Sequence, residues 1–190
     1  MNPSDRRTLL RNAFGLLVAL GVPGRVPAQA AADPRKLRPQ EGDVFVHALG
    51  GRRGEAVALA DLHPSSAPVT AWAKDPESGV TRDGSRLNQV LLMRLPEDEL
   101  SESTLSASAE GVVAYSGICP HTGCDVSKWR PESGNLLCSC HDSEFDPRVA
   151  AVVKMGPAPR RLPALPLRIE AGVLVAAGGF SARITFQRDL

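Results

Sequence analysis

The sequence predicts an all-β domain, either an antiparallel sandwich or a small barrel, and three observations support this. Proline and glycine are plentiful, with 16 and 17 residues, and they interrupt the chain at short intervals. The apolar runs between these interruptions are short. Few stretches are long enough for a regular helix. Short apolar runs separated by frequent turns are typical of strands in all-β domains.

The length of the chain indicates a single domain, and its net charge argues against nucleic-acid binding. A chain of 190 residues suffices for one domain with a real core plus tails. The formal net charge is +1, which gives no bulk electrostatic basis for binding nucleic acid. We therefore expect no nucleic-acid partner.

Residues 1–30 have the pattern of an export signal. Basic residues (Arg6, Arg7 and Arg11) precede an apolar run over residues 13–22, and residues 28–30 offer a small-x-small cleavage site. The ten-residue run is half of the roughly 20 residues that a membrane-spanning helix needs. A cleavable signal is therefore favoured over a permanent anchor, which stays the alternative.

The paired arginines resemble a twin-arginine signal, although Asp5 and Leu9 depart from its usual pattern. This route exports folded proteins, so a cofactor inserted in the cytoplasm would cross the membrane already bound. The resemblance implies a periplasmic location, with attachment to the inner membrane through the N-terminus if the signal is retained.

The remaining chain divides into a linker and one domain. Residues 31–42 are polar with two prolines and predict a linker, so residues 43–190 form the domain. The acidic, serine-rich stretch 96–110 predicts surface with a short helix. Residues 50–110 carry no motif and are a candidate surface for partner docking. Strands are predicted, in order, over residues 44–46, 57–59, 69–73, 88–95, 111–116, 135–137, 152–153, 165–169, 173–175 and 184–186.

All four cysteines and two of the four histidines lie in two short boxes. Box one, residues 119–124, reads C-x-H-x2-C, and box two, residues 138–143, begins C-x-C-H. Such clustering indicates a metal centre. A zinc site is the first alternative, but it would leave two cysteines spare. A pair of disulfides without metal is the second, and it would leave both histidines unexplained.

The two boxes resemble those of the high-potential branch of the Rieske [2Fe–2S] proteins, which includes subunits of cytochrome bc complexes and of arsenite oxidase. The resemblance covers about residues 111–175, and the flanks at residues 114–116 and 144–146 are most similar to the arsenite oxidase small subunit. It implies a Rieske-type antiparallel β-sandwich or barrel with a two-loop cluster-binding part over about residues 111–160. It also implies one [2Fe–2S] cluster with Cys119 and Cys138 on one iron and His121 and His141 on the other.

Cys124 and Cys140 are left over by this ligand set. In the high-potential branch the equivalent pair forms a disulfide between the two cluster loops, and an exported protein can keep such a bond. The low-potential ferredoxins and ring hydroxylases lack both cysteines, so their presence argues against that branch.

The resemblance assigns further residues around the cluster. Ser143 matches a serine that donates a hydrogen bond to a bridging sulfide and raises the reduction potential. Phe145 stands where bc-complex proteins often have tyrosine, and Asp142 replaces a common glycine. Both differences lower the potential, so we expect a value below that of typical bc complexes but within the high-potential branch.

Two glycines complete the expected cluster surroundings. Gly156 and Pro157 open a segment, residues 156–159, that matches the loop covering the cluster from a third side, called here the Pro loop. Gly123 is expected to serve the tight turn of box one.

One-electron transfer is the predicted function, as a periplasmic carrier or as a subunit of a larger oxidoreductase, not as a complete enzyme. The expected partner is a cytochrome or a catalytic subunit. The alternative is a membrane-anchored Rieske subunit of a quinol:cytochrome c oxidoreductase, in which quinol is the donor. A ring-hydroxylating oxygenase would need a further iron site, and only His47 and His63 remain outside the boxes, so we reject it.

Overall fold

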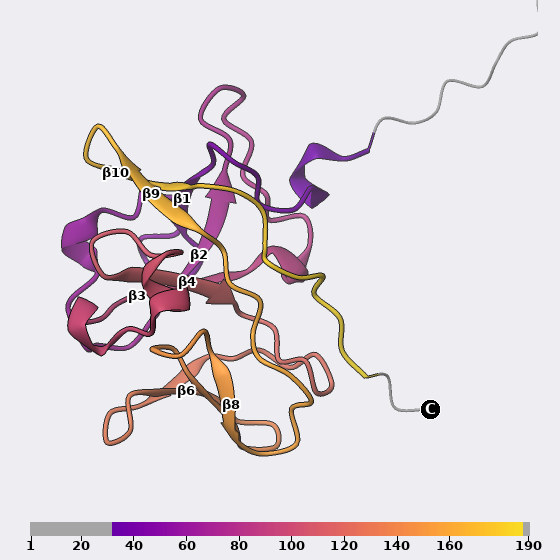
Figure 1. Cartoon of the computed structure of the whole chain (residues 1–190). Helices are drawn as coiled ribbons and strands as arrows, with labels where there is room; N and C mark the ends of the chain where they lie inside the picture. The colour runs from indigo at the N-terminus through magenta and orange to yellow at the C-terminus, as the bar shows by residue number, and fades with distance from the viewer. Residues whose placement is uncertain (1–31, 188–190) are drawn as a thin grey trace, which may run out of the picture. The chain divides into compact units, whose positions relative to one another are not determined.

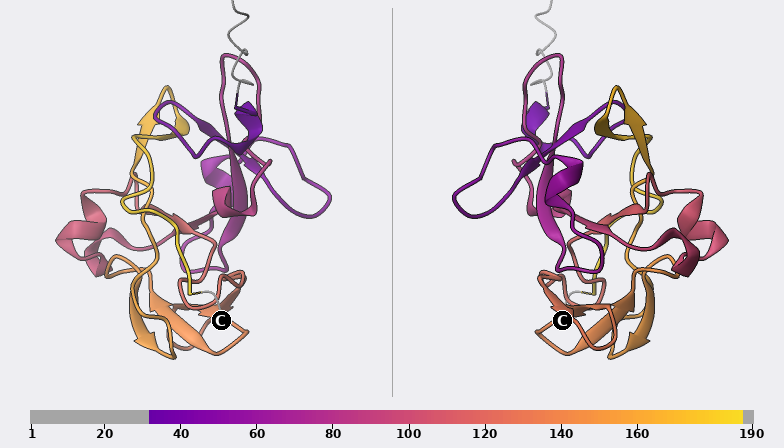
Figure 2. Two further views of the ribbon diagram at one scale, coloured as in Figure 1. Left: turned by 90° about the vertical axis from the view of Figure 1, so that its right-hand side faces the viewer. Right: turned by 90° about the vertical axis from the view of Figure 1, so that its left-hand side faces the viewer.

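The computed structural model describes residues 32–187, and the predicted export signal lies outside them. The described part is all-β, as predicted, with ten strands in two antiparallel sheets. The larger sheet has the order β4-β3-β2-β1-β10-β9, and the smaller has the order β5-β6-β7-β8. Both views in Figure 2 and the view in Figure 1 place the smaller sheet, in orange tones, at one end of the larger. The strands are β1 (Val44–His47), β2 (Val69–Lys74), β3 (Val90–Arg94), β4 (Val112–Ser116), β5 (Lys128–Arg130), β6 (Asn135–Cys138), β7 (Ser143–Asp146), β8 (Val152–Met155), β9 (Leu167–Glu170) and β10 (Val173–Ala176).

Helical structure among the described residues is limited to single turns. The predicted short helix in the acidic stretch is present as α1 (Glu102–Leu105), where the Ser101 side chain caps the first turn by accepting the amide of Thr104. The other turns are 3-10 helices: η1 (Pro34–Lys36), η2 (Leu59–Asp61), η3 (Arg86–Asn88) and η4 (Glu97–Glu99).

Two strand predictions are wrong. Residues 57–59 do not form a strand, because the Asp61 carboxylate accepts the amide of Ala58 and turns the chain into η2. Residues 184–186 are irregular although Ile184 is buried, and their contacts are described below. Conversely, β5 and β7 were not predicted, because each is a short, largely polar segment that becomes a strand by pairing with β6.

Two apolar clusters form the core. The first lies within the larger sheet and includes Phe45, Leu92 and Leu174. The second joins strands β3 and β4 to the smaller sheet, and it includes Cys119 and Cys138 of the two boxes. The Tyr115 hydroxyl also donates to the carbonyl oxygen of Pro147 at 2.7 Å, and burial raises the pKa of this phenol. The cysteines are thus held in packed core rather than in mobile surface loops.

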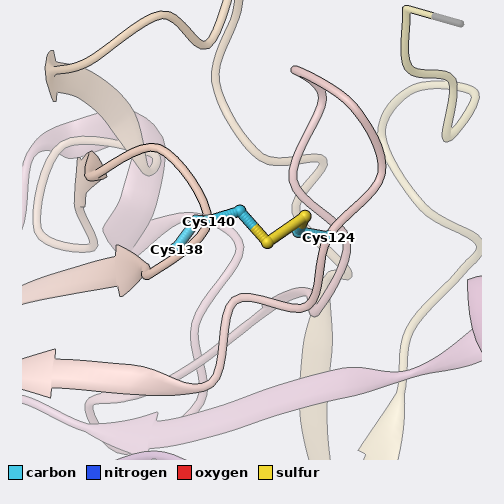
Figure 3. A group of neighbouring side chains, drawn as sticks. All are labelled: Cys124, Cys138 and Cys140. Carbon is cyan, nitrogen blue, oxygen red and sulfur yellow. A yellow bond between two sulfur atoms is a disulfide. The ribbon is translucent and has the colours of Figure 1, made fainter. Parts of the chain in front are cut away.

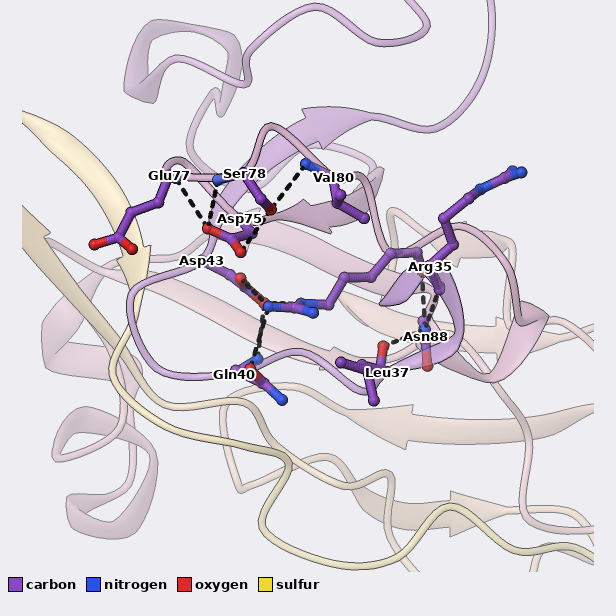
Figure 4. Close-up of polar contacts among 10 residues, drawn as sticks. Arg35, Leu37, Gln40, Asp43, Asp75, Glu77, Ser78, Val80 and Asn88 are labelled. Atoms are coloured by element: carbon purple, nitrogen blue, oxygen red, sulfur yellow. Dashed lines mark hydrogen bonds and ion pairs between the residues drawn. The ribbon is translucent and has the colours of Figure 1, made fainter. Parts of the chain in front are cut away.

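A buried polar network fixes the segment before β1 against the larger sheet (Figure 4). The guanidinium of Arg82 donates to both carboxylate oxygens of Asp43, at 2.6 and 2.8 Å, and the two side chains are 5% and 2% exposed. The Asn88 amide donates to the carbonyl oxygen of Leu37 at 2.7 Å. Part of the predicted linker, including buried Pro39, therefore lies against the domain.

Candidate metal centre

Box one is a closed loop between β4 and β5. The Cys119 amide donates to the carbonyl oxygen of Cys124 at 2.8 Å, and the Gly123 amide donates back to that of Cys119 at 3.0 Å. Gly123 has φ +83°, the left-handed region that a tight turn requires and that glycine adopts without strain. The loop thus presents Cys119 inward and His121 toward the surface.

Arg86 supports box one from η3, and no sequence motif marks this residue. Its guanidinium donates to the Gly123 carbonyl oxygen at 2.6 Å and to the Asp125 carboxylate at 2.8 Å. The contact joins residues 37 positions apart, so it depends on the tertiary structure alone.

Box two is the tight connection between β6 and β7. Cys138 ends β6 and pairs with Ser143, which begins β7. Asp142 has φ +53°. This left-handed conformation explains why glycine is common here in the family that the boxes resemble, and aspartate is among the side chains that tolerate it.

The four expected donors comprise two buried cysteines and two more exposed histidines. Cys119 and Cys138 are free thiols, each 1% exposed, whereas His141 is exposed and His121 partly so. The two Nδ1 atoms lie 3.2 Å apart, with the imidazole rings nearly perpendicular. Two nitrogens at about 2.0–2.1 Å from one tetrahedral ion would be about 3.3–3.4 Å apart, so this pair could bind a single tetrahedral metal ion.

Burial raises the pKa of the Cys119 thiol to about 11, and the neighbouring Cys138 adds to this effect. The backbone amide of His121 opposes this effect most, and the Ser143 hydroxyl opposes it to a lesser degree. Without a metal this thiol is neutral at pH 7. Thiolate ligation therefore requires a cation strong enough to displace the proton, as iron does.

Cys124 and Cys140 form a disulfide that joins the two boxes (Figure 3). Their sulfurs and that of Cys138 lie within 4.8 Å of one another. Two of these three sulfurs are consumed by the disulfide, so only Cys138 offers a thiolate. The disulfide therefore leaves one free cysteine in each box, Cys119 and Cys138.

The Pro loop follows β8 and lies against box two. A Cβ atom on Gly156, which has φ +88°, would lie 2.5 Å from the Cα atom of Ser143 and 2.7 Å from the Asp142 carbonyl oxygen. The Ser143 hydroxyl oxygen accepts the Ala158 amide at 3.2 Å. Pro157 is exposed. The close approach requires glycine at position 156 and holds the Pro loop against box two.

Three further residues named in the sequence analysis, Phe145, His47 and His63, lie outside the two boxes. Phe145 is fully buried beneath the boxes in the second core cluster. His47 lies on β1 with its Nε2 atom 3.3 Å from the Asp61 carboxylate, and His63 is exposed. Neither histidine belongs to the boxes.

Comparison with known proteins places this geometry in a family. The Rieske [2Fe-2S] domain model matches residues 88–166. A Streptomyces lividans protein named "Cytochrome bc1 complex Rieske iron-sulfur subunit" is 40% identical over 77% of this chain and 92% of its own length. A Streptomyces coelicolor protein of the same name is 33% identical over 92% of this chain. A Haloferax mediterranei protein, provisionally named a respiratory nitrate reductase Rieske subunit, is 39% identical over 54% of this chain.

The matches differ in how much of the relative they cover. The chain spans about half the length of the Streptomyces coelicolor and Haloferax mediterranei proteins, at 51% and 47%.

Proposed function

Because this chain belongs to the family of Rieske [2Fe–2S] proteins, we propose that it is the electron-transfer subunit of a larger oxidoreductase that works outside the cytoplasm. The chain holds one [2Fe–2S] cluster and transfers electrons one at a time. The observations that support the assignment are one buried free cysteine in each box and two box histidines whose Nδ1 atoms are 3.2 Å apart.

In this proposal Cys119 and Cys138 hold one iron, and His121 and His141 hold the other. When bound, such a cluster accepts and returns one electron at a potential well above the value of about −400 mV of all-cysteine plant-type clusters. The burial of both cysteines excludes water from the thiolate side. The Cys124–Cys140 disulfide keeps the two boxes at a fixed separation.

The histidine side is where we place electron exchange with a partner. His141 is exposed and His121 partly so, and the exposed Pro157 lies on the adjoining Pro loop. A partner that docks on this end of the domain would reach the imidazole edges directly. The cysteine side, enclosed by the second core cluster, offers no such approach.

The cluster surroundings support a moderated potential. The Ser143 hydroxyl accepts the Ala158 amide, which leaves its own proton free to donate to a sulfur of the site. Phe145 has no hydroxyl to make a second such bond, and Asp142 carries a carboxylate. We propose a potential below that of typical bc complexes, and redox titration tests it: a value near −400 mV would overturn the placement in this branch.

The export-signal pattern of residues 1–30 supports a location outside the cytoplasm. We propose export by the twin-arginine route and a periplasmic partner that is either a cytochrome or a catalytic subunit. The name of the Haloferax mediterranei relative supports a respiratory reductase as one such partner.

A bc-type complex is the second candidate, and the names of both Streptomyces relatives favour it. In that role the chain would stay attached to the inner membrane through residues 1–30 and take electrons from quinol. Among residues 32–187, no helix is long and apolar enough to cross a membrane.

Purification of the full chain from its native cells tests both candidates. The proposal expects two irons and two acid-labile sulfides per chain, with an EPR signal after reduction by ascorbate. A mature N-terminus near Ala31 in the periplasmic fraction would favour the exported subunit. An intact N-terminus in membranes, with a co-purifying cytochrome b, would favour the bc-type subunit. A preparation with bound zinc and no labile sulfide would refute both.

A further inference from the structure

The segment that follows β10 leaves the larger sheet and runs to the cluster loops. Figure 1 shows it in yellow, descending from β10 to the level of the smaller sheet, and Figure 2 agrees from both sides. It is fixed at its start, where the Ser181 amide donates to the Ala164 carbonyl oxygen at 2.7 Å and the Ser181 hydroxyl accepts the Ala164 amide at 2.9 Å. Beyond this point it forms no strand within the described residues.

Residues 184–187, called here the C-terminal clamp, contact box one directly. The Gln187 amide donates to the carbonyl oxygen of His121 at 2.7 Å. The Phe186 ring lies against Gly123, so closely that a Cβ atom there would approach it to 2.9 Å. The clamp therefore binds the backbone of an expected iron ligand and covers the turn that follows it.

The same clamp also contacts Arg160, the residue that follows the Pro loop. The Arg160 guanidinium donates to both the carbonyl oxygen and the hydroxyl of Thr185. Ile184 is 7% exposed and anchors the clamp in the domain. Box one and the residue that follows the Pro loop are thus joined by a segment that lies more than 40 residues beyond box two in sequence.

We propose that the C-terminal clamp holds the His121 backbone in position and shields the adjoining turn of box one from water while the outer imidazole edge stays open, with Phe186 and Gln187 as positioning residues that set the reduction potential. This rests on the proposed electron-transfer function. The reduced cluster carries one more negative charge than the oxidised one, and water stabilises the more highly charged form. A clamp that excludes water therefore lowers the potential, and its loss raises it.

The alternative is a segment that packs on the domain and contributes only stability. The two interpretations differ in what a Phe186→Ala variant changes. Loss of packing alone lowers the melting temperature and leaves the potential of the intact cluster unchanged. Loss of positioning and shielding raises the reduction potential and makes hydrogen exchange in box one faster.

The experiment compares full-length holoproteins. Phe186→Ala removes the ring at box one, and Phe180→Ala is the matched control, because Phe180 lies on the same segment but packs on the first core cluster. Hydrogen exchange of the peptide that contains box one is measured together with the reduction potential. If about half the burial of a phenylalanine is lost, local opening becomes about tenfold more frequent.

For Phe186→Ala the proposal expects faster hydrogen exchange in box one and a higher reduction potential, and for Phe180→Ala it expects wild-type values of both. Phe186→Leu keeps apolar bulk, so it should give intermediate values. It also serves as the test variant if the alanine variant does not fold. The proposal is overturned if Phe186→Ala, or Phe186→Leu where the alanine variant is not recovered, keeps the wild-type potential and box-one exchange. It is also overturned if Phe180→Ala changes the reduction potential and the box-one exchange as much as Phe186→Ala does. A wild-type protein without a cluster would instead reject the proposed function itself, before any variant is compared.

Discussion

Replacing Gly156 by alanine tests the contact between the Pro loop and box two. The added Cβ atom would lie 2.5 Å from the Cα atom of Ser143, 2.8 Å from its amide nitrogen and 2.7 Å from the Asp142 carbonyl oxygen. All three atoms belong to the backbone of box two, so no side-chain rotation can relieve the overlap. The Pro loop must move away from the site, or box two must deform.

The expected loss in the free energy of unfolding has two parts. Gly156 has φ +88°, and holding an alanine in the left-handed region costs roughly 1–2 kcal/mol. Forcing an extra methyl group into packed structure costs typically another ~1–3 kcal/mol. We therefore expect Gly156→Ala to reduce the free energy of unfolding by about 2–5 kcal/mol, out of the roughly 5–15 kcal/mol that domains usually have.

Gly172 provides the control, because it has φ +79° in the turn between β9 and β10 but nothing within 4 Å of an added Cβ atom. Gly172→Ala should lose only the backbone part. Urea denaturation of the two disulfide-intact holoproteins gives the difference, which we expect to be about 1–3 kcal/mol. Gly156→Ala should also alter the EPR signal of the cluster, and Gly172→Ala should not. Equal losses in the two variants would show that the close approach of the Pro loop to Ser143 does not exist in solution.

Three further predictions concern the ligands, the site surroundings and the core. His141→Ala should abolish the visible and EPR spectra of the cluster, whereas the exposed His63→Ala should keep both; a spectrum retained by His141→Ala would remove that histidine from the ligand set. Ser143→Ala leaves a buried amide without its acceptor, so urea denaturation should show a loss of about 1–3 kcal/mol, together with a lower reduction potential. An unchanged potential would mean that the hydroxyl makes no bond to the cluster. Asp43→Asn leaves the buried Arg82 guanidinium without its counter-charge and should cost about 3–5 kcal/mol in the same assay, so a wild-type urea midpoint would show that the pair is hydrated.

The sequence predicted most of the strands and failed where local preference and pairing disagree. The strongly apolar runs that became β3 and β4 were found because their side chains are buried on both faces. Lys128 and Arg130 gave no such signal, since their strand exists only through its hydrogen bonds to β6. Val57 reads as β-forming, but the Asp61 carboxylate bonds to the next amide and turns the chain.

The sequence predicted those parts of the candidate site that lie within a few residues of one another along the chain. Box spacing places one cysteine and one histidine of each box within three residues of each other, and resemblance supplied the Cys124–Cys140 pair that the structure joins. Arg86 and Phe186 could not be found in this way. Each contacts box one from a segment about 35 or more residues distant in sequence, and arginine and phenylalanine are common residue types that carry no metal-binding signal.

By itself, the sequence determined the two boxes with their candidate donors and indicated the family, because residue type and short spacing are fixed along a few residues of chain. Only the tertiary structure decided what encloses those donors. It brought the two Nδ1 atoms to 3.2 Å, put the Pro loop on Ser143 and carried the chain's last described residues back to His121. These contacts arise from the packing of segments that are distant in sequence, and packing depends on the shape of the whole domain rather than on any local pattern.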